Sequence, residues 1–373
     1  MKALRIATLS ILLTASTAFC GIVGSHSVGG LLTQADQVVV AAVRTGSSAA
    51  HALVIDLIVS RTLKGPALIG SGITATLSSP NVRVLTPGVL QMNGLISANL
   101  LVGRTGLWFL QRSGTEWVIL PLMSGDISQD DLYLPVPSVS PGPGFTYDTS
   151  AEPKTKLIQE IGAAAQDPAT AASIAHLEAM RVFADLGPGL LPMFDNLSAS
   201  PQSGTMAMGL AGQIRLGVPS ALETVANFDM GTFPQTAQSQ LASAVCEYRN
   251  TDPSGTNALA VLLRPQYSDS MRACAAHALR EIHSPQTLPL LEKLLEDSSP
   301  QIRYDAVIGI AQYAIGFPVA RMEDKKAAIA GFKPGPNFTS DMYPHYPAQG
   351  LFLSNEQEYI SYWKAWLAAH PAQ

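Results

Sequence analysis

The sequence predicts an α+β protein with more than one domain: a small N-terminal β-barrel or sandwich, followed by an α-solenoid of helical hairpins. Two observations predict this architecture. Strand-length apolar runs, punctuated by glycine and proline, fill the stretch from Ala35 to Met123. Farther along, a sequence pattern typical of a helix starts at Asp269 and is repeated from Pro300, 31 residues later. A fixed period of this length is typical of stacked helical repeats.

A chain of 373 residues is long enough for one domain plus a solenoid. The patterns divide it into six segments. We expect a signal peptide at 1–20, a β-rich domain at 21–133, a Pro/Gly-rich linker at 134–150, an α-solenoid of helical hairpins at 151–315, a long irregular loop at 316–353 and a C-terminal capping helix at 354–373. The linker is assigned because its prolines hold the backbone extended.

Composition narrows the class of partner. Hydrophobic residues make up 47% of the chain and charged residues only 14%, with a formal net charge of -5. Basic residues are scattered, and Lys325-Lys326 is the only adjacent basic pair. Because a nucleic-acid surface needs clustered basic side chains, we expect no nucleic-acid partner.

The first twenty residues have the pattern of an export signal. Two basic residues within 1–5 precede a short apolar core at 6–15, and small residues then offer a cleavage site. We therefore expect a periplasmic or secreted protein. No later stretch reaches about 18 uninterrupted apolar residues, so we expect no transmembrane span.

Cys20 followed by Gly21 leaves a second outcome open at the N-terminus. A lipoprotein would be anchored to the membrane through an acylated Cys20. Thr17 and Phe19 depart from the lipoprotein pattern, which has leucine at the first of these places and a small residue at the second.

Five apolar runs in the β-rich domain have strand length, at 38–43, 51–60, 73–77, 106–111 and 116–121. The residues between the last two, 112–115, predict a hairpin turn. Trp108, Phe109 and Trp117 lie within these runs, and we expect them in the core rather than in a ligand groove. Leu63-Lys64-Gly65 and Leu107-Trp108-Phe109-Leu110 resemble strands of netrin- and TIMP-like OB barrels. The resemblance implies a fold that often binds polymers.

The clearest repeats lie late in the chain. Three residues of the first copy, Arg272, Ala275 and Leu279, recur 31 residues later as Arg303, Ala306 and Ile310. Residues 284–297 predict the second helix of the hairpin. Weaker copies upstream suggest four or five repeats in all. The signature resembles the HEAT-like repeats of phycobilisome lyase relatives, found in exported bacterial proteins among many others.

This resemblance carries an expectation about packing. In the family, arginines that match Arg272 and Arg303 tie neighbouring turns together through an aspartate, and Asp269 and Asp297 are the candidates here. The earlier repeat has Met206 where that arginine is expected. The resemblance does not imply lyase activity, because fold similarity alone does not license an activity.

Cys246 and Cys274 fall on first helices of neighbouring repeats, but they are 28 residues apart instead of 31. An offset of about one helical turn favours two buried free thiols over a disulfide, whose α-carbons must lie within about 7 Å. Export makes the disulfide chemically allowed, so it remains the alternative.

Residues 354–357 have the pattern of a capping box and predict the start of the last helix. Tyr359, Trp363, Trp366 and Leu367 form its apolar stripe, which we expect to cover the end of the solenoid. Ligand stacking on the two tryptophans is the alternative.

No motif in the sequence points to catalysis or to a cofactor. Ser361 and Lys364 match a Ser-x-x-Lys pattern, but its companion motifs are missing from the sequence. His277 and His283 lie on different sides of a helix, and we expect a solvated His277. We therefore predict no catalytic residue, no cofactor and no metal ligand.

Acidic residues give no metal site either. Asp126, Asp130 and Asp131 lack the glycine and glutamate of a calcium loop, and Glu292, Glu296 and Asp297 are expected on a solvated helix face.

These observations favour an exported, non-enzymatic scaffold or interaction protein that binds another protein through the solenoid surface. The alternative is an envelope enzyme or carbohydrate-binding protein with a site where the β-domain meets the solenoid. The sequence names neither the partner nor the binding face.

Overall fold

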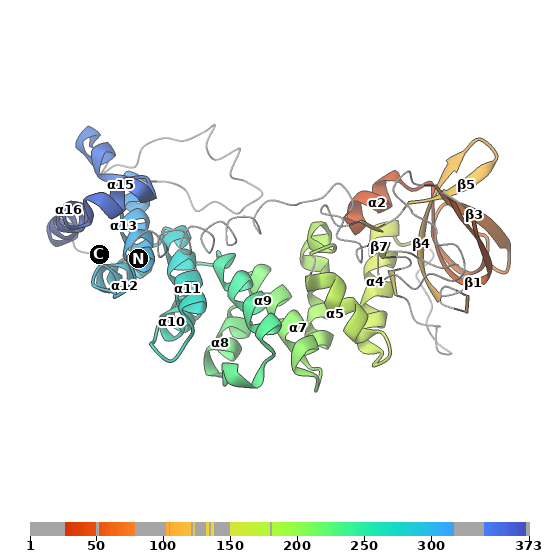
Figure 1. The fold of residues 1–373 in the computed structure, drawn as a ribbon, viewed down its shortest axis with the longest axis horizontal. Coiled ribbons are helices and arrows are strands. Elements are labelled where there is room, and N and C mark those ends of the chain that lie inside the picture. Colours follow the sequence, from red (N-terminus) through yellow and green to blue (C-terminus); the bar gives the residue numbers. More distant parts are fainter. Residues whose placement is uncertain are drawn as a thin grey trace, which may run out of the picture. The chain divides into compact units, whose positions relative to one another are not determined.

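The computed structural model describes residues 27–49, 52–78, 102–103, 105–120, 122–123, 132–133, 136–137, 150–179, 181–316 and 339–370. The chain forms two compact units, Met1–Met193 and Phe194–Gln373. The first contains a β-sheet and several helices, and the second is helical, so the fold is α+β (Figure 1). The export pattern with Cys20, and the three aspartates at 126, 130 and 131, lie outside the described residues.

Five strands of the first unit close into a barrel. The unit begins with the short helix α2 (Val28–Gln34) and continues with β1 (Gln37–Ala49), β2 (Ala52–Lys64), β3 (Gly72–Ser78), β4 (Thr105–Ser113) and β5 (Glu116–Ile119). The pairs β1–β2, β2–β3 and β4–β5 are antiparallel, and β3–β5 is parallel. β1 also pairs with β4, which closes the ring in the order β1-β2-β3-β5-β4. Closure decides for the barrel over the sandwich.

Alternating side chains fill the barrel. In β2, Ile55, Leu57 and Val59 are buried, whereas Ile58 and Ser60, which point to the other face, are exposed. Trp108 of β4 is almost completely buried, and its indole Nε1 donates to the carbonyl oxygen of Ala41 at 3.1 Å. The remaining core side chains are Val39, Ala41, Val43, Ile73, Ala75, Leu110 and Ile119.

The predicted strands and the hairpin are confirmed. Gly114 takes a positive φ of 60° in the turn between β4 and β5. Phe109 is buried, as expected, but Trp117 is only half-buried and stacks under the Arg112 guanidinium, 4.7 Å from the ring centre. Three short strands follow, β6 (Leu122–Met123), β7 (Leu132–Tyr133) and β8 (Val136–Pro137). β8 lies in the expected linker and pairs with β4, where an edge position tolerates proline.

Several helices follow the barrel strands in the first unit. They are α4 (Pro153–Gln166), α5 (Ala171–Ala179) and η2 (Ala184–Leu190), and α6 (Leu191–Ser198) crosses the boundary between the units. α4 packs on β2, where Arg61 and Glu160 form a buried, two-pronged ion pair with Nη2–Oε2 at 2.9 Å. The Asp185 carboxylate accepts from the backbone of Gly30 at the start of α2. A carboxylate there complements the positive end of the helix.

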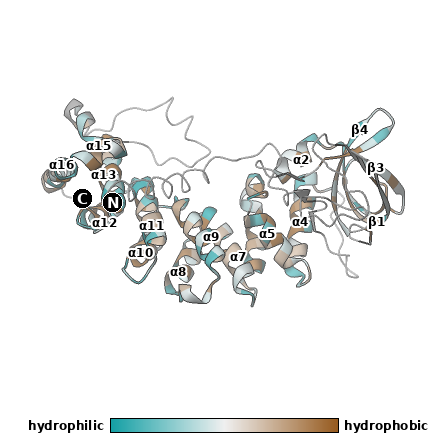
Figure 2. Cartoon of the chain, viewed as in Figure 1, coloured by the Kyte–Doolittle hydropathy of each residue, from teal (hydrophilic) through white to brown (hydrophobic). Residues whose placement is uncertain are grey.

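The second unit consists of helix pairs stacked in sequence (Figure 1). Its first helices are α7 (Ser203–Arg215), α9 (Gln235–Cys246), α11 (Asp269–Ile282) and α13 (Pro300–Ile315), and its second helices are α8 (Pro219–Asn227), α10 (Pro253–Leu262) and α12 (Leu288–Leu294), with the 3-10 turns η3 (Met230–Thr232) and η4 (Pro285–Thr287). α7 packs on α9, α9 on α11 and α11 on α13, while α8 packs on α10. Brown apolar and teal polar patches mix along these helices (Figure 2), as expected when one face is buried.

Local signals set the ends of these helices. Ser268 caps α11 by accepting from the backbone of Met271, and proline occupies the first position of α8, α10 and α13. At the other end of α11, His283 takes the left-handed conformation with a φ of 49°. A non-glycine residue there is uncommon, and a hydrogen bond between its Nε2 and Gln312 Oε1 at 2.9 Å holds it.

The last helices close the end of the second unit. They are η6 (Ser340–His345), α15 (Gln349–Ser354) and α16 (Glu356–Ala369). The described end of the 316–353 stretch is therefore helical and not irregular. The capping box at Ser354 is also wrong, because Ser354 still belongs to α15 and donates to Gly350; the residue before α16 is Asn355, which makes no side-chain cap.

Candidate functional site

The fourth residue of each first helix forms a ladder along the second unit. It is Met206 in α7, Gln238 in α9, Arg272 in α11 and Arg303 in α13. Three of the four donate to a carbonyl oxygen in the loop before their own helix: Gln238 to Phe233 at 2.9 Å, Arg272 to Leu263 at 3.0 Å, and Arg303 to Asp297. Each of these donors satisfies an acceptor between stacked pairs. Met206 has no donor to offer.

The family-based expectation about aspartates holds at one of the two arginines. Arg272 binds Asp297 at 2.6 Å, across the array, and lies 3.5 Å from Asp269 of its own helix. Arg303 instead pairs with Glu356 of α16. Sequence spacing could not show this, because residues 316–355 separate the two elements. Asp297 is consequently not part of a solvated face, whereas Glu292 is exposed and Glu296 pairs with Lys364 at the surface.

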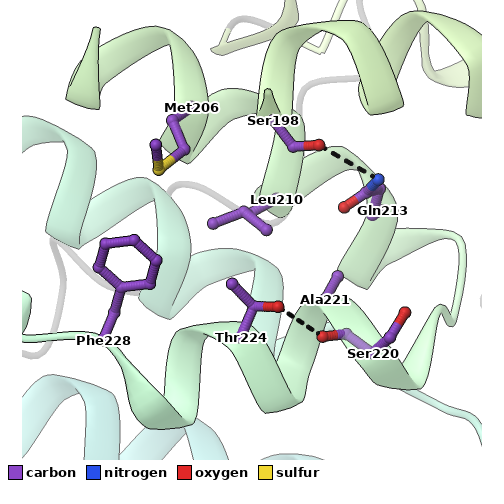
Figure 3. Close-up of a pocket in the computed structure, with 8 residues that line it drawn as sticks. All are labelled: Ser198, Met206, Leu210, Gln213, Ser220, Ala221, Thr224 and Phe228. Atoms are coloured by element: carbon purple, nitrogen blue, oxygen red, sulfur yellow. Dashed lines mark hydrogen bonds between the residues drawn. The ribbon is translucent and has the colours of Figure 1, made fainter. Parts of the chain in front are cut away.

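A groove lies where the ladder is interrupted. It has a volume of about 340 Å³ and is formed by α6, α7 and α8, with Ser198, Met206, Leu210, Gln213, Ser220, Ala221, Thr224 and Phe228 as its lining. Figure 3 shows Met206 and Phe228 at one end of the groove and Gln213 with Ser220 at the other. Phe228 is one of the few large apolar side chains that remain exposed. The groove thus has an apolar end and a polar end.

The polar groups of the groove are held in place by the protein. Gln213 donates to Asp195 at 2.7 Å. It also donates to Ser198 at 3.4 Å (Figure 3). Thr224 donates to the backbone oxygen of Ser220 at 2.8 Å. Asp195, which accepts from Gln213 at the polar end of the groove, is itself exposed. Sequence reasoning noticed Met206 only as a departure from the repeat and did not predict the groove.

A buried charged network joins α11 to α13. Asp305 is almost completely buried and binds Arg280 at 3.0 Å and Gln301 at 3.0 Å. His277 Nδ1 lies 3.6 Å from the same carboxylate while 35% of its side chain is exposed, so His277 is only partly solvated. Burial works to raise the pKa of Asp305, but the hydrogen bond and charge of His277, the charge of Arg280 and the hydrogen bond from Gln301 hold it below its usual range. The network is closed on itself and fastens two helices.

Both cysteines of the described region are free and half-buried. The prediction of free thiols is confirmed, although the side chains are half-buried and not buried. The spacing predicted them about a turn out of register, whereas they face each other between α9 and α11.

The aromatic stripe of α16 is buried, as expected. Trp363 is fully buried and donates from Nε1 to the carbonyl oxygen of His345 at 2.8 Å, and α16 packs on α13. His345 stacks on Tyr362, with 3.6 Å between ring centres. Ser361 bonds Gln357, and Lys364 is engaged by Glu296, so the two residues of the Ser-x-x-Lys pattern have separate partners.

Within the part of the chain that the structure describes, no three His, Cys, Asp or Glu side chains gather as metal ligands would. The described helices also include none with the length and apolar character needed to cross a bilayer.

Comparison with known proteins adds little. No protein-family model matches this sequence, and a search of curated proteins finds no relative. Among solved structures, the crystal structure of an engineered protein matches with 18% sequence identity, covers 49% of this chain and 81% of its own, and has a TM-score of 0.27. A similarity with so low a TM-score carries no argument about function.

Proposed function

We propose that this chain is an exported, non-enzymatic scaffold that binds another protein through a HEAT-like solenoid. We further propose that the groove beside Met206 is the docking point and that it receives a basic side chain of the partner. The interruption of the ladder at Met206 is the observation that carries the proposal.

The finer description of both units is part of this proposal. Regular stacking of α7, α9, α11 and α13, with the repeat residues Arg272 and Arg303 at the same helix position, supports a HEAT-like solenoid. The strand order β1-β2-β3-β5-β4, closed by β1 and β4, supports an OB-like barrel in the first unit. The basic and apolar pattern of residues 1–20 supports export to the periplasm or the exterior, and Cys20 keeps a lipid anchor as the alternative to a free N-terminus.

The groove fits the end of an arginine or lysine side chain. In later repeats an arginine occupies the ladder position, with its stem against the helices and its guanidinium on loop oxygens. At Met206 the same position lacks a donor, while Leu210 and Phe228 offer apolar surface for an aliphatic stem. The exposed carboxylate of Asp195, which contacts Gln213 at the polar end of the groove, favours a cationic tip. A basic side chain of the partner would supply, at the position of Met206, the donor that the later helices supply themselves.

Site-specific photo-crosslinking in cells that express the full chain tests this proposal. A photo-reactive amino acid replaces Thr224, which is exposed and lines the groove, and in a parallel chain it replaces Ile69, which is exposed in the first unit. We expect one protein adduct of defined mass at position 224 and none at position 69. The adduct peptide, identified by mass spectrometry, should contain arginine or lysine.

A matched pair of variants makes the test specific. Met206→Arg restores the arginine of the later repeats and should fill the groove, so we expect at least a tenfold loss of the adduct, which corresponds to about 1.4 kcal/mol. Gln238→Arg makes the same charge change at the ladder position of the next helix, where the place is already taken. It should leave the adduct unchanged. Absence of any adduct at position 224, or equal loss in both variants, would refute the groove as the docking point.

The other hypothesis places an enzyme or carbohydrate site where the barrel meets the helices. At that junction the buried side chains of Arg61 and Glu160 bind each other. That hypothesis requires ligand binding to survive Met206→Arg and to depend on the first unit instead.

A further inference from the structure

Cys246 and Cys274 come together although their spacing in the sequence differs from the repeat period. Cys246 is the last residue of α9, and Cys274 is the sixth residue of α11. The two helices pack against each other, and the cysteine side chains face each other. Both remain half-buried, so a small reagent can reach them.

A second pair of residues shows that this meeting follows from the register of the helices. Arg280 is the twelfth residue of α11 and binds Asp305, the sixth residue of α13, at 3.0 Å. Cys246 is likewise the twelfth residue of α9, and Cys274 is the sixth residue of α11. Successive first helices are thus displaced so that position twelve of one meets position six of the next. A spacing of 28 residues is what this register requires of Cys246 and Cys274.

The surroundings keep the pair in the dithiol form at rest. The hydrogen bond to Cys274 and burial raise the pKa of the Cys246 thiol, and the charge of Asp305 acts in the same direction, while the Arg249 guanidinium opposes them. A protonated thiol is a poor nucleophile, so oxidation needs a supplied oxidant and proceeds slowly.

We propose that Cys246 and Cys274 are a modification site, at which a small-molecule disulfide such as oxidised glutathione converts the pair into a reversible disulfide between α9 and α11. One cysteine, as the thiolate, attacks a sulfur of the oxidant and releases one glutathione, which takes up a proton. The second cysteine, after losing its proton, attacks the mixed disulfide and releases the second glutathione. The protein gives up two electrons and two protons, and the oxidant's S–S bond is reduced to two thiols.

The disulfide would raise the resistance of the stacked helices to unfolding. It joins α9 and α11, which pack against each other, through a covalent bond. Closing the chain between residues 246 and 274 also restricts the unfolded state. The oxidised chain should therefore have a higher unfolding midpoint than the reduced chain. This inference does not depend on the groove or on the partner.

The test uses the full chain with Cys20→Ser, which removes the third cysteine. The chain is incubated with oxidised glutathione, alkylated and digested with trypsin, which separates the two cysteines by cutting after Arg249 and Arg272. We expect the two peptides to be joined by a disulfide that dithiothreitol removes. The thermal midpoint, followed by circular dichroism, should rise on oxidation and fall back on reduction.

Single variants provide the control. Cys246→Ser and Cys274→Ser should each retain the helical spectrum, show no midpoint increase with the oxidant, and leave the remaining cysteine with at most a mixed disulfide. The proposal is overturned if the parent chain ends with stable glutathione adducts on both cysteines or with disulfide-linked dimers. It is equally overturned if both thiols stay free in the folded chain under conditions that oxidise the urea-unfolded chain.

Discussion

At the scale of single residues, Asp305 is a buried charge of the second unit whose stability depends on its partners. Its carboxylate is almost completely buried and is shared by Arg280, Gln301 and His277. Removal of one partner from a buried ion pair leaves the other charge uncompensated. Asp305→Asn keeps the shape and removes the charge, so we expect the unfolding free energy to fall by about 3 kcal/mol at neutral pH. Urea unfolding followed by far-UV circular dichroism measures this.

The same substitution has a pH signature. The pKa of Asp305 lies below its usual value in the folded chain, so its contribution to stability is fully present above the unfolded pKa of about 4. The contribution is lost as the pH falls from there through the folded pKa. The difference between the parent chain and Asp305→Asn should therefore shrink below about pH 4. Glu223→Gln, at an exposed carboxylate, should change stability by no more than about 0.5 kcal/mol. A difference that stays constant from neutral to acid pH would contradict this account.

At the scale of helices, close approach decides which glycines can be replaced. A β-carbon on Gly209 of α7 would lie 2.2 Å from the backbone nitrogen of Ser198 in α6, so the two backbones would have to separate. A β-carbon on Gly162 of α4 would meet nothing within 4 Å. Both residues are inside helices, where alanine is favoured over glycine by about 1 kcal/mol.

The two glycines therefore form a matched pair for a stability measurement. Gly162→Ala should stabilise the chain by about 0.5–1 kcal/mol through helix propensity. Gly209→Ala should destabilise it by about 1–3 kcal/mol, because overpacking outweighs the propensity. Thermal unfolding of both variants checks the sign. If Gly209→Ala stabilised the chain, α6 and α7 would be able to move apart without a loss of packing energy.

The comparison of sequence and structure is clearest at this scale. Apolar periodicity predicted the five barrel strands and the buried Trp108, because burial leaves a local trace in the sequence. Repeat spacing placed Arg272 and Arg303 at equivalent positions, and the family resemblance offered Asp269 and Asp297 as partners, of which Asp297 makes the shorter contact with Arg272. Neither could give Glu356 as the partner of Arg303, because that contact depends on how α16 folds back. The free state of Cys246 and Cys274 was predicted correctly, but their proximity was not, because the displacement between successive helices is a tertiary property.

The groove illustrates a different limit. In the sequence, Met206 stands where the repeat pattern has an arginine. That substitution alone does not show whether neighbouring side chains fill the space that the arginine would occupy. Here Phe228 stays exposed and Gln213 turns towards Asp195, so the space remains open. Whether a substitution leaves a void depends on side-chain packing, which one sequence does not specify.

At the scale of the whole molecule, each helix pair of the second unit packs mainly on its neighbours along the chain. In such an array stability is approximately a sum of terms for each pair and each interface. α16 covers the outer side of the last pair through its contact with α13, and Trp363 is its fully buried anchor. A substitution that destabilises α16 should therefore lower the local stability of the adjacent helices more than that of distant ones.

Hydrogen exchange of Trp363→Ala tests this idea of a graded array. The variant loses a large buried side chain and the hydrogen bond to His345, at a cost of about 3–5 kcal/mol. Amide exchange, read by mass spectrometry, should accelerate most in α13 and α16, less in α11, and little in α7 or in the barrel strands. Lys364→Ala, on the surface of the same helix, should leave the exchange pattern nearly unchanged, because exposed ion pairs contribute little. Equal acceleration from α7 to α16 would show that the second unit unfolds as one block, and its helix pairs would then not be independent units of stability.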